Sequence, residues 1–185
     1  NGNIAATQLI VDYDFVQPTV NISGPTTPQN TPFIATFTFT EEVSGFELLD
    51  ILVSNGSVSE LLGSGNSYTA LVSPLADGVV TLNVSASAVT DLAGNENISS
   101  NTLSVAFDTT SPKAIISGPN EAQNGTFSST ITFSENVSGM SLSNIMVTNG
   151  VASNLTGSGL SYSFEITPTA NGEVIVSFAE GGVVD

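Results

Sequence analysis

The sequence repeats itself with a period of 94 residues. Residues 1–91 align with residues 95–185 without a gap, and about four in ten aligned positions carry the same amino acid. A repeat of this length indicates duplication of one folding unit, so we expect two domains of the same kind. The identities are densest in ISGP (22–25 and 116–119), in FTEEVSG and FSENVSG (39–45 and 133–139), and in GSGNSY and GSGLSY (63–68 and 157–162).

Within each repeat, apolar and polar residues alternate with a period of two. In FIATFTF, residues 33–39, the aromatic residues fall on one side of an extended chain and the threonines on the other, which is typical of a half-buried strand. Runs rich in Gly, Asn and Ser separate such segments, as turns do. The pattern predicts an all-β fold with about seven short antiparallel strands per repeat and almost no helix. The same alternation returns at 80–84, 103–107, 127–133 and 174–178.

Three longer stretches carry a family resemblance. They are FSENVSGMSLSNIMVTNG, GSGLSYSFEITPTANGEV and AVTDLAGNENISSNTLSVAFDTTSP. These stretches resemble the bacterial immunoglobulin-like repeats that occur in tandem in very large surface adhesins and other extracellular proteins. The resemblance covers the whole chain. It implies two tandem immunoglobulin-like β-sandwiches and a mechanical role as a spacer outside the cell, and it names no ligand.

The family's strand order suggests where the modules begin and end. A module closes with the strand in NTLSVAF, after the DLAGN loop, so module 1 is predicted at 15–108 and module 2 at 109–185. Module 2 stops at the counterpart of Asp91 and is therefore expected to be incomplete, without its closing strand. Residues 1–14 align with that strand and are predicted to close a preceding or neighbouring module.

Three hypotheses are open for this arrangement, and the simplest is a monomer with both ends free. In another hypothesis, the 185 residues are a slice of a longer tandem array. In the remaining one, the N-terminal strand completes module 2 of a neighbouring copy by β-strand addition. That strand would bury Leu9, Val11 and Tyr13, which is worth roughly 5 to 9 kcal/mol and rivals the stability of a whole domain. We therefore expect adjacent repeats or other copies as partners.

The charge of the chain is strongly acidic. Seventeen carboxylate side chains accompany one basic residue, Lys113, and the formal net charge is −16. Such a surface is not expected to bind nucleic acid or anionic membranes. No apolar run approaches the roughly 18 to 20 residues needed to span a bilayer, so insertion into a membrane is not expected either. Cysteine is absent, so disulfides and thiolate metal sites are excluded.

The acidic residues suggest a calcium site at the end of each module. In immunoglobulin topology, the loop after the second strand and the loop before the last strand lie at the end where the linker enters. Carboxylates from separate elements, without a basic partner, suit calcium, which takes about six to eight oxygen ligands. The predicted sets are Asp14, Glu41 and Asp91 in module 1, and Asp108, Glu135 and Asp185 in module 2.

The DLAGN loop offers a further candidate ligand, Asn95. This loop resembles the acidic and Asn-containing loops by which cadherin-type repeats hold calcium between domains. Calcium there would stiffen the joint between modules. The alternative is a turn without metal, because Asp and Asn side chains commonly bond their own backbone in turns.

Other functions find less support in the residues. The chain has no His, Cys or Arg, so a nucleophile with an activating base is not expected and neither is enzymatic activity. A carbohydrate- or ligand-binding β-sandwich is the alternative from another class. Sugar sites usually expose aromatic rings, and Tyr68 and Tyr162 recur beside the GSG turn. We expect packing at the strand end to be their role.

Overall fold

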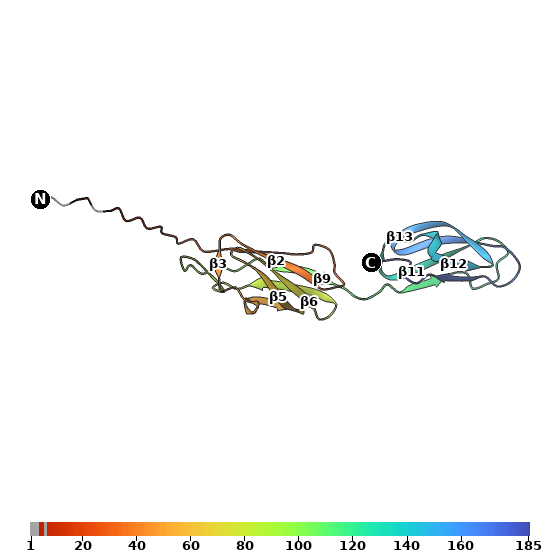
Figure 1. The fold of residues 1–185 in the computed structure, drawn as a ribbon. Coiled ribbons are helices and arrows are strands. Elements are labelled where there is room, and N and C mark those ends of the chain that lie inside the picture. The colour runs from red at the N-terminus through yellow and green to blue at the C-terminus, as the bar shows by residue number, and fades with distance from the viewer. Residues whose placement is uncertain (1–3, 6) are drawn as a thin grey trace. The chain divides into compact units, whose positions relative to one another are not determined.

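The computed structural model describes residues 4, 5 and 7–185, and it divides the chain after Thr109 into two compact units. The expectation of almost no helix is confirmed for this part of the chain, which contains strands and two single-turn 3-10 helices, η1 (Leu48–Asp50) and η2 (Leu142–Asn144) (Figure 1). Neither helix is long and apolar enough to cross a membrane. The proposed closing strand at 1–14 lies partly outside the described residues, at positions 1–3 and 6.

Unit 1 is a sandwich of two antiparallel sheets. One sheet has the order β1-β2-β6-β5, the other has the order β4-β7-β9, and β3 and β8 form a short separate ladder. This is the arrangement of a constant-type immunoglobulin domain, and the predicted fold class is confirmed. The strands are β1 (Val20–Ser23), β2 (Phe33–Phe39), β3 (Val43–Ser44), β4 (Ile51–Ser54), β5 (Gly56–Ser64), β6 (Ser67–Pro74), β7 (Gly78–Val84), β8 (Thr90–Asp91) and β9 (Leu103–Phe107).

The core of unit 1 lies between the two sheets. Strand β2 buries Phe33, Ala35, Phe37 and Phe39 and leaves the residues between them exposed or half-exposed, as its period of two predicts. An aromatic cluster forms at one place in this core, where Phe46 packs its ring 5.3 Å from those of Phe37 and Phe39. Burial of each such side chain stabilises the fold by roughly 1.5 to 3 kcal/mol.

Unit 2 repeats this plan with two smaller sheets. Strands β10 (Ala114–Ser117), β11 (Phe127–Val137) and β13 (Gly150–Pro168) form one sheet. Strands β12 (Ile145–Thr148) and β14 (Ile175–Phe178) form the other. In the 94-residue alignment, β13 covers the positions of both β5 and β6, and β14 covers the end of β7. Among the residues that the structure describes, β14 pairs with β12 alone, whereas β7 pairs with both β4 and β9.

The turn between β5 and β6 requires glycine. Gly63 has φ +115°, and a Cβ atom there would lie 2.2 Å from the carbonyl oxygen of Ser67. Its counterpart Gly157 has the same φ, and a Cβ atom there would lie 2.3 Å from the oxygen of Ser161. No side chain fits at that distance, so the repeated GSG motif is explained by turn geometry.

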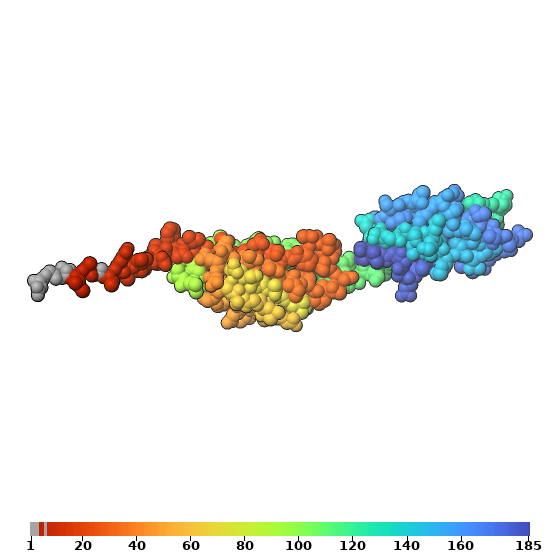
Figure 2. Space-filling view, turned by 45° about the horizontal axis from the view of Figure 1, so that its top comes forward, coloured from red at the N-terminus to blue at the C-terminus, as the bar shows by residue number. Residues whose placement is uncertain are grey.

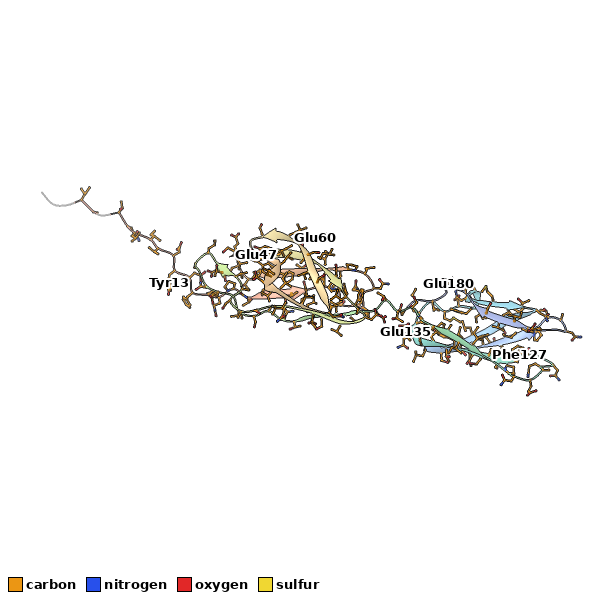
Figure 3. The ribbon with its side chains drawn as sticks, turned by 90° about the horizontal axis from the view of Figure 1, so that it is seen from below. Tyr13, Glu47, Glu60, Phe127, Glu135 and Glu180 are labelled. Atoms are coloured by element: carbon orange, nitrogen blue, oxygen red, sulfur yellow. The ribbon has the colours of Figure 1, made fainter. Side chains whose placement is uncertain are left out.

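The free edge of the larger sheet in unit 1 carries a bulge. Strand β5 loses register with β6 between Ser59 and Leu62, and Glu60, within this stretch, has φ +53° and is exposed (Figure 3). Asn154, its counterpart in unit 2, has φ +52°. The two units therefore share a left-handed residue at the same place on the edge strand.

The N-terminal segment forms no strand in its described part, residues 4, 5 and 7–19. Its apolar side chains are exposed to solvent, with Leu9 at 85%, Val11 at 73% and Tyr13 at 85% (Figure 2). A strand partner for this segment stays a prediction at this point.

Candidate metal centre

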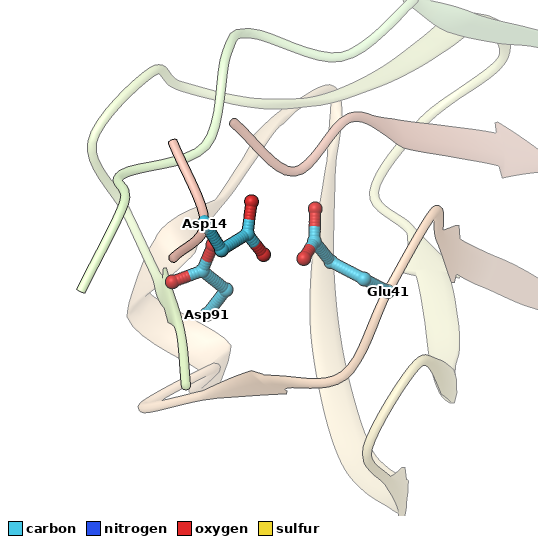
Figure 4. A group of neighbouring side chains, drawn as sticks. All are labelled: Asp14, Glu41 and Asp91. Carbon is cyan, nitrogen blue, oxygen red and sulfur yellow. The ribbon is translucent and has the colours of Figure 1, made fainter. Parts of the chain in front are cut away.

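Three carboxylates of unit 1 meet beside the β3–β8 ladder. Asp14 precedes β1, Glu41 lies between β2 and β3, and Asp91 ends β8. The ladder pairs Val43 with Asp91, which brings Glu41, two residues before Val43, next to the DLAGN loop. One oxygen from each carboxylate lies within 4.8 Å of the others, and the side chains point toward one another (Figure 4).

Asp91 is held by its own loop. Its Oδ1 accepts a hydrogen bond from the backbone N–H of Asn95, and its Oδ2 accepts one from the side-chain amide of Asn95, both at 2.8 Å. Asp91 is 5% exposed, and this burial opposes ionisation, but the hydrogen bonds from Asn95 and from the N–H groups of residues 93 and 94 outweigh it. They hold the pKa of Asp91 below its usual value, so this carboxylate is charged at neutral pH.

Asn95 also connects the loop to the linker. Its side-chain nitrogen donates to the backbone oxygen of Asp14 at 3.3 Å, while Oδ1 of Asp14 accepts from the N–H of Val16 at 2.9 Å. In this arrangement the Asn95 amide acts as a donor to two acidic residues. It orients the Asp91 carboxylate, and the amide nitrogen of Asn95, not its oxygen, makes these contacts. Its predicted role as a metal ligand stays a prediction.

The pKa of Glu41 is shifted in the opposite direction to that of Asp91. Its half-buried position, and then the negative charges of Asp14 and Asp91, raise its pKa above the usual value for Glu. Removal from water and like charges both disfavour the ionised form. The cluster therefore brings negative charge together at an energetic cost, which a bound cation would offset.

Asn97 is a structural residue that the sequence reasoning did not single out for this role. It is 1% exposed, and its Oδ1 accepts from the N–H groups of Ala88 and Val89 at 2.8 and 2.9 Å. Its Nδ2 donates to the oxygens of Ser85 and Ile98 at 2.9 and 2.8 Å. Asn97 thus fixes the chain on both sides of the DLAGN loop. A single Asn in an Asn-rich loop carries no signal that would have predicted this.

Unit 2 brings together two of its three predicted carboxylates. Glu135 and Asp185 each offer an oxygen within 4.8 Å of the other. Ser138 and Val184 form a bridge at the place where Ser44 and Thr90 pair in unit 1. Asp108 belongs to unit 1, where it follows β9 and donates its backbone N–H to the oxygen of Gln29 at 3.0 Å. Its membership of the second set stays a prediction.

The recurring tyrosines are packing residues. Tyr68 and Tyr162 are buried, and their hydroxyl groups donate to the backbone oxygens of Val43 and Val137 at 3.4 and 3.2 Å. Each ring meets a phenylalanine edge-to-face at 6.0 Å, Phe39 in unit 1 and Phe133 in unit 2. Neither ring has an exposed face on which a sugar could stack.

Comparison with known families agrees with this topology. The model of the bacterial Ig-like domain matches twice, at residues 14–107 and 108–185. The chain belongs to the bacterial Ig-like domain family. The two bacterial Ig-like domains are consecutive, so the predicted family and the tandem arrangement are confirmed. No curated protein sequence matches the chain.

Two solved structures of bacterial proteins resemble these tandem bacterial Ig-like domains. The first is invasin, described as a bacterial integrin-binding protein, with 20% identity, a TM-score of 0.45 and coverage of 90% of this chain and 38% of that one. The second is FdeC, described as an Escherichia coli adhesin, with 14% identity, a TM-score of 0.49 and coverage of 91% and 63%. The chain therefore spans less than two thirds of either.

Proposed function

We propose that this chain is a structural repeat unit of an extracellular stalk, adhesin or fibre at a cell surface, and that calcium bound by its loops stiffens the junctions between modules. Membership of the bacterial Ig-like domain family supports the first part. The observation that carries the second part is the convergence of Asp14, Glu41 and Asp91 within 4.8 Å.

The chemistry of this cluster favours calcium. Calcium binds oxygen ligands at about 2.3 to 2.6 Å, so the oxygens around one ion lie at most about 5 Å from one another. The three carboxylates meet that condition, and the chain's only basic residue, Lys113, belongs to the other unit. Asp91 is ionised and fixed by Asn95, while burial, and then the charges of Asp14 and Asp91, raise the pKa of Glu41. A divalent cation would pair with all three charges.

The placement of the ligands gives calcium a mechanical effect. Asp14 lies in the segment that enters the module, whereas Glu41 and Asp91 lie on loops of the sandwich itself. An ion that bridges them would tie the entering segment to the module and restrict its motion. Ion binding to the folded state also adds stability by mass action, about 2.7 kcal/mol at an ion concentration of 100 times Kd.

The partners of such a unit are adjacent repeats or neighbouring copies of the chain. Repeats with one plan stack end to end, and a sheet edge left unpaired in one module is completed by a strand from the next. The acidic surface keeps such an array soluble and away from anionic surfaces.

Thermal unfolding and calorimetric titration test the calcium proposal. We expect millimolar calcium to raise the melting temperature above that in EGTA, and Asp91→Asn to remove most of this rise. Glu60→Gln, which neutralises an exposed carboxylate outside the cluster, is the matched control and should keep it. Equal melting temperatures in calcium and EGTA, without a heat of binding, would contradict the proposal.

A further inference from the structure

Four Asn-Gly pairs lie in the described part of the chain. In such a pair the backbone nitrogen of the glycine can attack the side-chain amide of the asparagine, because glycine has no side chain to obstruct the approach. The attack needs the nitrogen to come within about 3 to 3.5 Å of the Asn Cγ atom. The surroundings of each pair therefore decide whether it reacts. The pairs are Asn55–Gly56 in unit 1 and Asn124–Gly125, Asn149–Gly150 and Asn171–Gly172 in unit 2.

Asn55 and Asn149 occupy the same place in the two units and are held by their side-chain amides. Both have a left-handed backbone, with φ of +53° and +59°. Nδ2 of Asn55 donates to the backbone oxygen of Ala76 at 2.8 Å. Nδ2 of Asn149 donates to the oxygens of Ala170 and Glu173, both at 3.1 Å. Rotation of either side chain toward the following nitrogen would break these hydrogen bonds.

The glycine that follows each of these asparagines is closely packed. A Cβ atom on Gly56 would lie 3.3 Å from the backbone oxygen of Ser73. A Cβ atom on Gly150 would lie 3.1 Å from Cγ1 of Val147. The two glycines also begin strands β5 and β13. Neighbouring atoms fix their backbones, so a reaction at either pair requires local unfolding.

Asn124 and Gly125 lie in the loop between β10 and β11 and lack both restraints. Asn124 is exposed, and its side chain has no hydrogen-bond partner in the part of the chain that the structure describes. A Cβ atom on Gly125 would meet nothing within 4 Å outside its chain neighbours. Asn30, the aligned residue of unit 1, is exposed as well, although the adjacent Gln29 donates its N–H to the oxygen of Ala106 on β9. Exposure thus belongs to this position of the fold.

Asn171 is an intermediate case. Its side chain is exposed, but the turn around it is anchored on both sides, because Asn149 binds the oxygens of Ala170 and Glu173. Gly172 has φ +131°, and a Cβ atom there would lie 3.6 Å from Nδ2 of Asn149. The anchored turn restricts the motion that the attack needs, so Asn171 should react more slowly than Asn124.

We propose that Asn124 is a site of spontaneous modification, at which the chain closes a succinimide ring with Gly125 and then opens it. The Gly125 nitrogen attacks Cγ of Asn124 and loses its proton, a C–N bond forms, and the side-chain amide leaves as ammonia. Water then adds to one of the two ring carbonyl carbons and cleaves its bond to that nitrogen. The product is aspartate or, where the backbone now runs through the former side chain, isoaspartate. Water is the only co-reactant, and each event adds one negative charge.

This modification goes beyond the proposed function and does not depend on calcium. The candidate metal ligands Asp14, Glu41 and Asp91 belong to unit 1, whereas Asn124 belongs to unit 2. Ring opening does not restore the amide, so the change is permanent. Unit 2 therefore gains negative charge with age at the β10–β11 loop, while Asn149 keeps the amide that anchors its own turn.

Peptide mapping by mass spectrometry tests the proposal on the 185-residue chain after storage at neutral pH. Digestion at acidic pH prevents further ring closure during the analysis. We expect the peptide with Asn124 to deamidate first, about 10-fold or more faster than those with Asn55 and Asn149, which must first unfold locally. Equal rates at Asn124 and Asn149 would overturn the proposal.

Gly125→Thr is the matched variant, because Asn30 of unit 1 is followed by Thr31. Gly125 lies in open space and outside the left-handed region, so a threonine fits there without strain. The variant should keep the unfolding midpoint of the parent and lose nearly all deamidation at Asn124. A variant that deamidates as fast as the parent would show that Gly125 is not the attacking residue.

Two further results are required. The parent should yield isoaspartate together with aspartate at residue 124, since direct hydrolysis of the amide gives aspartate alone; aspartate alone would overturn the ring mechanism. In concentrated urea the rates at Asn124 and Asn149 should converge, because the packing that protects Asn149 is lost. A difference that persists in urea would assign the selectivity to the local sequence and overturn its structural origin.

Discussion

Asn95 donates two hydrogen bonds of 2.8 Å to the carboxylate of Asp91, one to each oxygen. The carboxylate is therefore fixed in direction and kept ionised by its own loop. A ligand that is oriented in advance loses little freedom when an ion binds.

Removal of the Asn95 side chain should weaken calcium binding without removing a carboxylate. We expect Asn95→Ala to lower the affinity by about 10- to 100-fold, the usual effect of losing a group that orients a metal ligand. Isothermal titration calorimetry measures this change. Asn66→Ala, an exposed turn residue, is the control. An unchanged affinity in Asn95→Ala would show that Asp91 does not need this support.

The raised pKa of Glu41 predicts how stability depends on pH without calcium. The folded state holds the Glu41 proton more tightly than the unfolded state, so its contribution to stability falls as pH rises from the ordinary Glu pKa through the raised value. Glu41→Gln removes this loss. In EGTA at neutral pH the variant should be more stable than the parent in urea unfolding, and the difference should shrink below the ordinary Glu pKa. A less stable variant at neutral pH would refute this.

Asp91 has the opposite dependence. Its pKa is lowered in the folded state, so its contribution is present above the ordinary Asp pKa and is lost as pH falls through the lowered value. Asp91→Asn should therefore destabilise the calcium-free protein at neutral pH, whereas Glu41→Gln stabilises it. Opposite signs for the two variants in the same urea titration are the expected result, and equal signs would contradict the electrostatic description.

Asn97→Ala should be the most damaging substitution in the DLAGN region. It leaves the N–H groups of half-buried Ala88 and buried Val89, and two carbonyl oxygens, without their partner, and unsatisfied buried groups cost about 1 to 3 kcal/mol each before the loop relaxes. We expect a loss of about 3 kcal/mol in the free energy of unfolding, measured by urea denaturation. The exposed Asn21→Ala on β1 should change stability little. A loss below about 1 kcal/mol would mean that water replaces these bonds.

The β5–β6 turn offers a test that separates backbone strain from steric clash. Gly45 has φ +83° with open space around it, whereas Gly63 has φ +115° with the Ser67 oxygen in the way. Gly45→Ala should cost about 1 kcal/mol, from the left-handed backbone alone. Gly63→Ala should cost about 3 kcal/mol or more, because the turn must open. Similar unfolding midpoints for the two variants would disagree with this geometry.

The fold class followed from the sequence because two independent periods agree. The 94-residue repeat gave the number of domains, and the two-residue alternation in segments such as 33–39 gave the strands and their buried faces. The two-residue strands β3 and β8 lie below the length at which alternation is visible. The packing of the two cores could not be predicted either. Ala70 of unit 1 aligns with Phe164 of unit 2, and Phe46 aligns with Met140. How a core accommodates such changes in side-chain volume depends on the neighbours in three dimensions.

The candidate site was predictable in its carboxylates but not in its amides. Topology places the ends of Asp14, Glu41 and Asp91 at one end of a sandwich, and the structure brings these three together. The role of Asn95 depends on which way its amide faces, and that of Asn97 depends on four backbone groups meeting at one point. Neither role follows from residue type or spacing, so neither role could be predicted from the sequence.

The bulge at Glu60 opposes edge-to-edge pairing when many such domains are joined in one polymer. Tethered neighbours with related sequences meet at high local concentration, and flat sheet edges would then zip together into aggregates. A left-handed residue and a negative charge at Glu60 make that edge a poor template in unit 1, and Asn154 preserves the backbone kink in unit 2. Each domain thus presents one sheet edge that resists pairing with a tethered neighbour, so each can fold without joining its sheet to that of the next domain along this edge.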